Sequence, residues 1–200
     1  MTTRIIVPHR GLEHAKTRLG GVLDPAERAA VAERLLRHVL GAAVASGHEV
    51  VVISPDPGLE PLVSAAGARL TVQHGMGLNT GLAEARADAI GDGVTVLGVL
   101  HGDLPTLAVE EVEALLNAAR GSDRPMVAIA PDAAETGTNG LALSPPAVIG
   151  FHFGPDSLVA HRKAAKRAGA WVTLVRRPGL AFDVDTPADL DAWVAGGQVA

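Results

Sequence analysis

The sequence predicts a single α/β domain over residues 1–200, in which a mostly parallel sheet is covered by helices on both faces. Strand-like and helix-like stretches alternate from end to end, and several strand-like stretches are apolar throughout, as strands buried on both faces are. No linker-like segment or internal repeat divides the chain. A length of 200 residues suits one domain with a full-sized core.

The first half of the chain begins with a short apolar strand at 4–7. Residues 24–27, Asp-Pro-Ala-Glu, predict the start of a long helix because they combine a capping residue, a first-turn proline and a glutamate at the third helical position. The β-branched run EVVVIS at 49–54 predicts a buried strand. The elements expected next are a short helix over 59–66, a strand at 69–72 and a helix around 82–89.

The second half contains the most apolar run, VTVLGVL at 94–100, which predicts a central strand. The elements expected after it are a helix over 109–119, strands at 126–131 and 140–144, a helix after Gly154-Pro155, a strand at 171–175 and a last helix after Thr186-Pro187. In open α/β sheets, ligands bind at the carboxyl ends of the strands, so the loops there are the candidate site.

The composition excludes several classes of function. The formal net charge is −5 and aromatic residues make up 2% of the chain, which disfavours binding to nucleic acid. There is no cysteine, so disulfides and thiolate zinc sites are excluded. We see no signal peptide and no apolar run long enough to span a membrane. We therefore expect a cytoplasmic protein without a nucleic-acid or membrane partner.

The loop after the first strand carries three cations, Arg10, Lys16 and Arg18. Cations at the end of a strand could hold a polyphosphate, although a solvated basic loop fits the sequence equally well. The loop contains neither a Walker A motif nor a G-x-G-x-x-G fingerprint, which disfavours a P-loop enzyme and a dinucleotide cofactor.

Three carboxylates form a candidate site for Mg²⁺. Asp103 follows the central strand, where it could hold a hard divalent cation or cap its own turn. Asp183 and Asp185 stand two residues apart in a segment that we expect to be extended. We expect their carboxylates to point in different directions, so that at most one of them joins Asp103. Asp189 is expected to be structural, in the first turn of the last helix.

Other kinds of catalytic site are not indicated. The eight histidines show no zinc-binding spacing, and His101 and His152 are interpreted as ordinary loop histidines. There is no G-x-S-x-G motif, and Ser157 has no evident paired base. The stretch FGPDS at 153–157 predicts a helix start, which either binds an anion or is capped by Asp156 or Ser157.

Six short motifs, taken together and in order, resemble the 2-phospho-L-lactate guanylyltransferase family. They are AKTRL at 15–19, GLN at 77–79, GDLP at 102–105, TGTN at 136–139, FGPDS at 153–157 and DVDTP at 183–187. Relatives of that family include the phosphoenolpyruvate guanylyltransferases, and all serve biosynthesis of the deazaflavin coenzyme F-420. The resemblance extends from about residue 5 to 190 and implies a Rossmann-like, glycosyltransferase-A-like nucleotidyltransferase fold.

The resemblance also implies a reaction and a set of site residues. GTP and a phosphorylated three-carbon acid would be joined with release of diphosphate, with Lys16 and Asp103 as catalytic residues. The implied contacts are Arg10, Lys16, Arg18 and Asn79 for the nucleotide, Thr138, Asn139, Gly154 and Ser157 for the acid, and Asp103 with Asp183 or Asp185 for Mg²⁺. The chain departs from the family at His9-Arg10, where Val-Lys is usual, and at Gly102, where Ala is common.

Two alternatives stay open. Another nucleotidyltransferase, of the molybdopterin guanylyltransferase or sugar-phosphate type, would usually carry a Gly-rich first loop, which is absent here. A nucleotide-binding regulatory domain without turnover would not need the three metal carboxylates. The sequence does not select among phosphoenolpyruvate, 2-phospholactate and a phosphoglycerate, and it leaves open the oligomeric state and a downstream transferase of the same pathway as a partner.

Overall fold

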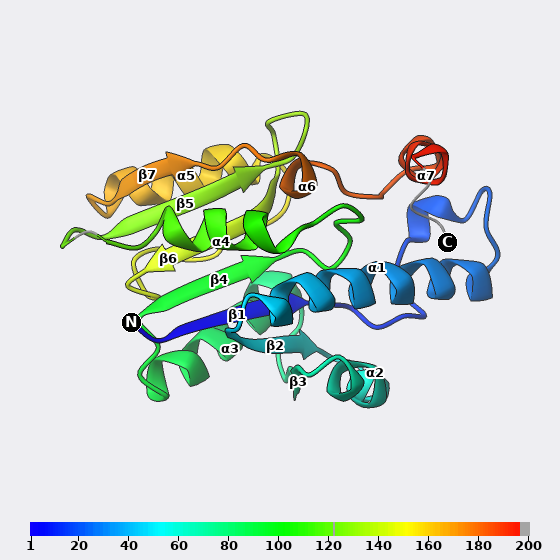
Figure 1. The fold of residues 1–200 in the computed structure, drawn as a ribbon, viewed down its shortest axis with the longest axis horizontal. Coiled ribbons are helices and arrows are strands. Elements are labelled where there is room, and N and C mark those ends of the chain that lie inside the picture. Colours follow the sequence, from blue (N-terminus) through cyan, green and yellow to red (C-terminus); the bar gives the residue numbers. More distant parts are fainter. Residues whose placement is uncertain (122, 197–200) are drawn as a thin grey trace.

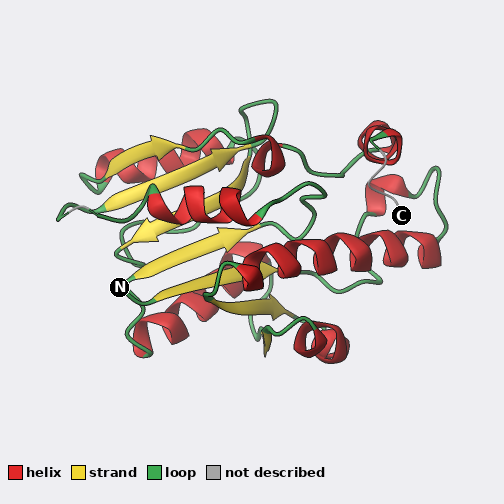
Figure 2. Cartoon of the chain, in the orientation of Figure 1, coloured by secondary structure: helices red, strands yellow, loops and turns green. Residues whose placement is uncertain are grey.

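A computed structural model describes residues 1–121 and 123–196 and contains a seven-stranded sheet (Figures 1 and 2). The strand order is β3-β2-β1-β4-β6-β5-β7, and every pair of neighbours is parallel except those that β6 makes with β4 and β5. The strands are β1 (Thr3–Pro8), β2 (Glu49–Ser54), β3 (Arg69–Val72), β4 (Val96–Leu100), β5 (Met126–Pro131), β6 (Thr138–Ser144) and β7 (Trp171–Leu174). The predicted mostly parallel sheet is confirmed. Of the predicted domain, residue 122 and the last four residues lie outside the described residues.

Helices cover both faces of this sheet (Figure 1). The helices are α1 (Pro25–Ala45), α2 (Glu60–Ala65), α3 (Leu78–Gly91), α4 (Val109–Asn117), α5 (Ser157–Arg167), α6 (Pro178–Ala181) and α7 (Pro187–Ala195). Side chains of α1, α2 and α4 pack in one core with Val7, whereas those of α3 and α5 pack in a second core with Ile6. Successive residues of a strand point to opposite faces, so β1 contributes to both cores.

Two predicted helix starts are confirmed. The Asp24 side chain accepts a hydrogen bond from the Glu27 backbone N–H at 2.8 Å, and the Glu27 side chain accepts one from the Asp24 N–H at 2.8 Å. Thr186 and Asp189 form the same reciprocal pair at the start of α7, which confirms the structural role predicted for Asp189.

A third, small cluster holds α7 against the middle of α1. Its buried members are Leu35, Val184 and Trp193. Val184 also donates its backbone N–H to the carbonyl oxygen of Asp103 at 3.3 Å. The segment that contains Asp183 and Asp185 is therefore fixed beside the loop that follows β4.

Two elements differ from the sequence predictions in a way that affects the site. Helix α3 begins at Leu78, directly after Gly77 at φ +91°, rather than around residue 82. Strand β6 is antiparallel to β4, and the His101 N–H donates to the Asn139 carbonyl at 3.0 Å. The first residues of β6 therefore lie at the carboxyl end of β4.

Within residues 1–121 and 123–196, no helix combines the length and apolar character that a bilayer crossing requires.

Candidate active site

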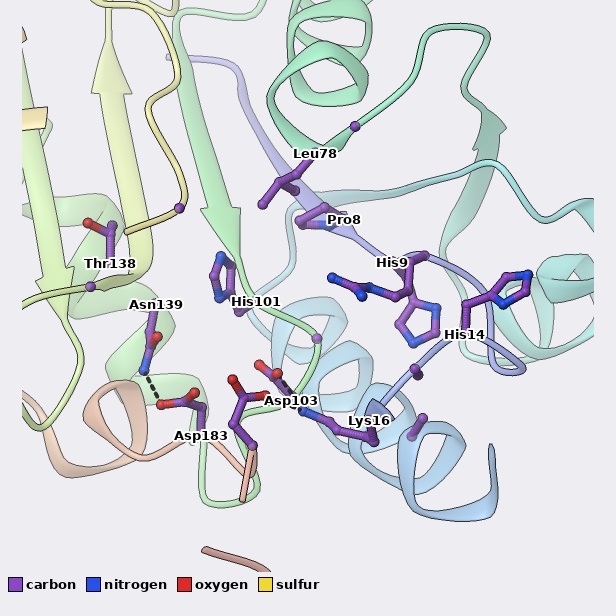
Figure 3. A pocket seen from close by; sticks show the side chains of 18 of the residues that line it. Pro8, His9, His14, Lys16, Leu78, His101, Asp103, Thr138, Asn139 and Asp183 are labelled. Atoms are coloured by element: carbon purple, nitrogen blue, oxygen red, sulfur yellow. Dashed lines mark hydrogen bonds and ion pairs between the residues drawn. The ribbon is translucent and has the colours of Figure 1, made fainter. Parts of the chain in front are cut away.

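A cavity of about 650 Å³ lies where the parallel strands end and β6 begins (Figure 3). It brings together side chains from loops that are far apart in the sequence. The predicted site residues that line it are Arg10, Lys16, Asp103, Thr138, Asn139, Gly154, Ser157, Asp183 and Asp185. The loops that the carboxyl-end rule for open α/β sheets selects therefore line one cavity.

Three carboxylates meet in this cavity. Asp103, Asp183 and Asp185 each offer an oxygen atom, and these oxygens lie within 4.8 Å of one another. The prediction that only one of Asp183 and Asp185 could join Asp103 was wrong. Alternate residues of an extended segment face the same side, so burial of Val184 turns both neighbouring carboxylates toward the cavity.

Lys16 lies against the carboxylates. Its Nζ is 2.6 Å from Asp103 Oδ2 and 3.3 Å from Asp185 Oδ1, and its side chain is only 7% exposed. The Lys16 backbone adopts the left-handed conformation, φ 52°, just before a 3-10 turn, Thr17–Leu19, whose Leu19 is fully buried. Non-glycine residues rarely adopt this conformation, and such residues are concentrated at functional sites.

The electrostatics of the cluster suit a divalent cation. Three carboxylates and one ammonium carry a formal charge of −2, which one Mg²⁺ would neutralise. Burial would by itself raise the pKa of Asp103, but the Lys16 charge and hydrogen bond hold that pKa below its usual range. Burial and the Asp103 charge raise the pKa of Asp183. Asp103 Oδ1 is buried and has no hydrogen-bond partner among the described residues, so it is available as a metal ligand.

The opposite wall of the cavity is built from β6 and the start of α5. Asn139 donates from Nδ2 to Asp183 Oδ1 at 3.1 Å, which links this wall to the carboxylates (Figure 3). Gly154 has φ +132°, and a Cβ placed there would meet no atom within 4 Å. Asp156, the residue before α5, makes no side-chain capping bond, so its side chain does not cap this helix. Ser157 is buried at 2% exposure and lines the cavity.

Two predicted nucleotide contacts are not among the cavity-lining residues. Asn79 donates from Nδ2 to the Phe153 carbonyl at 2.9 Å and accepts from the Phe153 N–H at 2.9 Å. The Asn79 amide thus fixes the loop that precedes α5, and a contact with the nucleoside stays a prediction. Arg18 is 73% exposed and pairs with Asp185 Oδ2 at 3.1 Å, at the outer side of the carboxylate cluster.

Two histidines that lie at or behind the cavity were given no role from the sequence. His9 lines the cavity, accepts the Gly11 N–H at Nδ1 over 3.1 Å, and has its pKa lowered to about 4, chiefly by burial. His161 is fully buried behind Thr138, with ring nitrogens bonded to both Thr138 and His152. Its position four residues after Ser157, on the same face of a predicted helix, was the signal that could have indicated it.

Comparisons with known proteins show which family this chain belongs to. The model of the guanylyl transferase CofC-like family matches residues 3–199. A phosphoenolpyruvate guanylyltransferase of Rubrobacter xylanophilus is 42% identical over 100% of this chain and 97% of its own length. One from Sphaerobacter thermophilus is 40% identical over 96% and 92%.

Solved structures show the same fold at low sequence identity. CMP:2-keto-3-deoxy-manno-octonic acid synthetase has a TM-score of 0.64 at 18% identity, with full coverage of both chains. The 4-diphosphocytidyl-2C-methyl-D-erythritol synthase from Anaerococcus prevotii has a TM-score of 0.65 at 11% identity, with 98% coverage of both. The predicted nucleotidyltransferase fold is confirmed. On the family match and the identity to its relatives, this chain belongs to the CofC-like guanylyl transferase family.

Proposed function

We propose that this protein transfers the guanylyl group of GTP to the phosphate of phosphoenolpyruvate, with release of diphosphate, in the biosynthesis of coenzyme F-420. The observation that carries the proposal is the cluster of Asp103, Asp183, Asp185 and Lys16 in one cavity. The names of the relatives supply the acceptor acid. A sugar-phosphate or molybdopterin acceptor, or nucleotide binding without turnover, is the alternative that the experiment below tests.

In this reaction an oxygen of the acceptor phosphate attacks the α-phosphorus of GTP, and the bond between the α-phosphorus and the oxygen that bridges to the β-phosphorus breaks. The attacking phosphate monoester has a second pKa of about 6, so it is already largely dianionic at pH 7. No side chain has to remove a proton. The obstacle is the repulsion between two anions, so the site has to supply positive charge and alignment.

Asp103, Asp183 and Asp185 would hold the Mg²⁺, which when bound neutralises negative charge on the phosphates. Lys16 would then be released from part of its pairing with the carboxylates and would donate to the phosphates of GTP. Arg10, in the same loop, lines the cavity and would add a second cation, and exposed Arg18 would lie at its outer side.

The acid would bind at the opposite wall, with Thr138, Asn139, Gly154 and Ser157. Gly154 leaves space for close approach of an anion to the backbone, and the positive end of the α5 helix dipole would favour an anion there. Asn79 would act by fixing the Phe153 backbone beside this wall. We further propose a cytoplasmic location and a downstream transferase of the same pathway as the recipient of the product.

The experiment measures diphosphate release with GTP or ATP and, in turn, phosphoenolpyruvate, 2-phospholactate, 3-phosphoglycerate, a sugar phosphate and molybdopterin, at fixed Mg²⁺. We expect turnover with GTP and phosphoenolpyruvate, and loss of turnover when Mg²⁺ is removed with EDTA. Asp191→Asn, an exposed change on α7 away from the cavity, is the matched control for carboxylate variants and should retain full activity. Turnover with a sugar phosphate but none of the three acids would refute the proposal.

A further inference from the structure

His161 is a buried polar residue that the reaction described above does not use. Its side chain is fully buried in α5, and its ring lies 4.9 Å from the ring of Phe153 in an edge-to-face arrangement. Both ring nitrogens are engaged: Nδ1 lies 3.1 Å from Thr138 Oγ1, and Nε2 lies 3.0 Å from the backbone nitrogen of His152. The backbone carbonyl of Ser157, one turn earlier in α5, is a further acceptor for a ring N–H of His161. A buried histidine with defined partners has one preferred arrangement of its protons.

The partners determine which nitrogen carries the proton. The His152 backbone N–H can only donate, so Nε2 of His161 must be the unprotonated acceptor. Burial, together with the charges of His152 and His101, lowers the pKa of His161 to about 4, so the ring is neutral at pH 7. A neutral ring with an unprotonated Nε2 carries its proton on Nδ1. The hydrogen bond to Thr138 therefore runs from His161 Nδ1–H to the hydroxyl oxygen.

The direction of this hydrogen bond determines where the Thr138 hydroxyl proton can point. Because its oxygen accepts from His161, its own O–H proton points away from the imidazole, and Thr138 lines the cavity. We infer that His161 is a positioning residue, which keeps the Thr138 hydroxyl as a hydrogen-bond donor to the anionic group of the phosphorylated acid. The inference rests on the proposed function, in which Thr138 contacts that acid.

His161 also fixes the other side of the acid pocket. By accepting the His152 N–H it holds the chain immediately before Phe153 and Gly154, while Asn79 holds both backbone groups of Phe153. A single imidazole thus links β6 to the loop that leads into α5. Its loss should weaken binding of the acid and leave binding of GTP unchanged.

Two conservative variants separate the two bonds of His161. In His161→Asn the amide N–H takes approximately the place of Nδ1 and can still donate to Thr138. In His161→Gln the amide oxygen takes approximately the place of Nε2 and can still accept from His152, but the donor to Thr138 is lost. We expect His161→Gln to raise the KM for the acid about tenfold, the effect of one hydrogen bond to a charged group, and His161→Asn to raise it clearly less.

Thr138→Val completes a double-mutant cycle, since it keeps the shape of the side chain and removes the hydroxyl. Thr138→Val alone and the double variant with His161→Gln should each raise the acid KM about tenfold, rather than about a hundredfold for the pair, with the KM for GTP unchanged. His152→Gln, an exposed neighbour whose backbone N–H is retained, is the matched control and should not change either KM. Melting temperatures identify variants that are misfolded.

The ¹⁵N spectrum of histidine-labelled wild-type protein tests the tautomer without any substitution, and we expect His161 to be protonated at Nδ1 only. Protonation at Nε2, equal acid KM values in His161→Asn and His161→Gln, or additive effects in the cycle would overturn the inference and leave the proposed function standing. An acid KM unaltered in Thr138→Val would overturn the inference and remove Thr138 from the acid pocket, whereas guanylyl transfer itself is tested separately by diphosphate release.

Discussion

Replacing Asp183 with asparagine should stabilise the metal-free protein and abolish its response to Mg²⁺. Of the three clustered carboxylates, Asp103 and Asp185 pair with Lys16, whereas Asp183 accepts a hydrogen bond from the amide of Asn139 and lies within 4.8 Å of both. Two unit charges at that distance repel by about 3.5 kcal/mol at an effective dielectric constant of about 20. Attraction to Lys16 and solvent offset most of this, so we expect a net gain of about 1 kcal/mol, or roughly 2–4 °C in melting temperature.

The raised pKa of Asp183 determines how the stability gained in Asp183→Asn depends on pH. The pKa of Asp183 is raised in the folded protein by burial and by the Asp103 charge. A raised pKa means that the native carboxylate destabilises the fold progressively as the pH rises above the value in the unfolded chain, about 3.9. The advantage of Asp183→Asn should therefore be near zero at about pH 4 and fully present at pH 7.

The assay is differential scanning calorimetry with EDTA and with Mg²⁺, at both pH values, beside the Asp191→Asn control. Wild-type protein and the control should melt at a higher temperature with Mg²⁺ at pH 7, and Asp183→Asn should lose most of that increase together with turnover. An Asp183→Asn protein that melts below wild type in EDTA at pH 7, and that Mg²⁺ still stabilises normally, would exclude both charge repulsion at Asp183 and its role as a metal ligand.

Three further predictions concern the same cavity. Asp103→Asn should abolish Mg²⁺-dependent turnover, because a neutral amide is a poor ligand for this ion; a near-normal rate at limiting Mg²⁺ would exclude Asp103 as a ligand. Lys16→Ala should lower turnover on the order of 100-fold and lower the melting temperature in EDTA, since Asp103 and Asp185 lose their buried partner, and Mg²⁺ should restore part of that temperature. Ser157→Ala should raise the acid KM about tenfold with the GTP KM unchanged; a loss of stability of about 1 kcal/mol with both KM values unaltered would instead assign Ser157 to capping α5.

Much of the fold could be predicted because its signals are local. The reciprocal cap at 24–27 and the β-branched run at 49–54 each depend on a few adjacent residues, and both elements begin where the sequence indicates. The direction of β6 could not be predicted in this way. A short apolar run pairs equally well in either direction, and the choice depends on the strands beside it.

The sequence predicted which loops line the cavity, but not which of their residues contact one another. Asp103, Asp183 and Lys16 lie in loops that the carboxyl-end rule selects, so their convergence follows from the sheet. The pairing of Lys16 with Asp103 spans 87 positions in the sequence, and the clamp of Asn79 on Phe153 spans 74. Contacts of this kind depend on tertiary packing, which no local pattern encodes.

The most direct test of the reaction is mass analysis of the product formed from GTP and phosphoenolpyruvate labelled with ¹⁸O in the non-bridging oxygens of its phosphate. We expect a product in which the GMP unit is joined to the acid through the acid's own phosphate. All of the label should be found on that phosphate or on the new bridge between the two phosphorus atoms, and none in the released diphosphate. Label in the diphosphate, or guanosine monophosphate beside unmodified acid, would contradict the account.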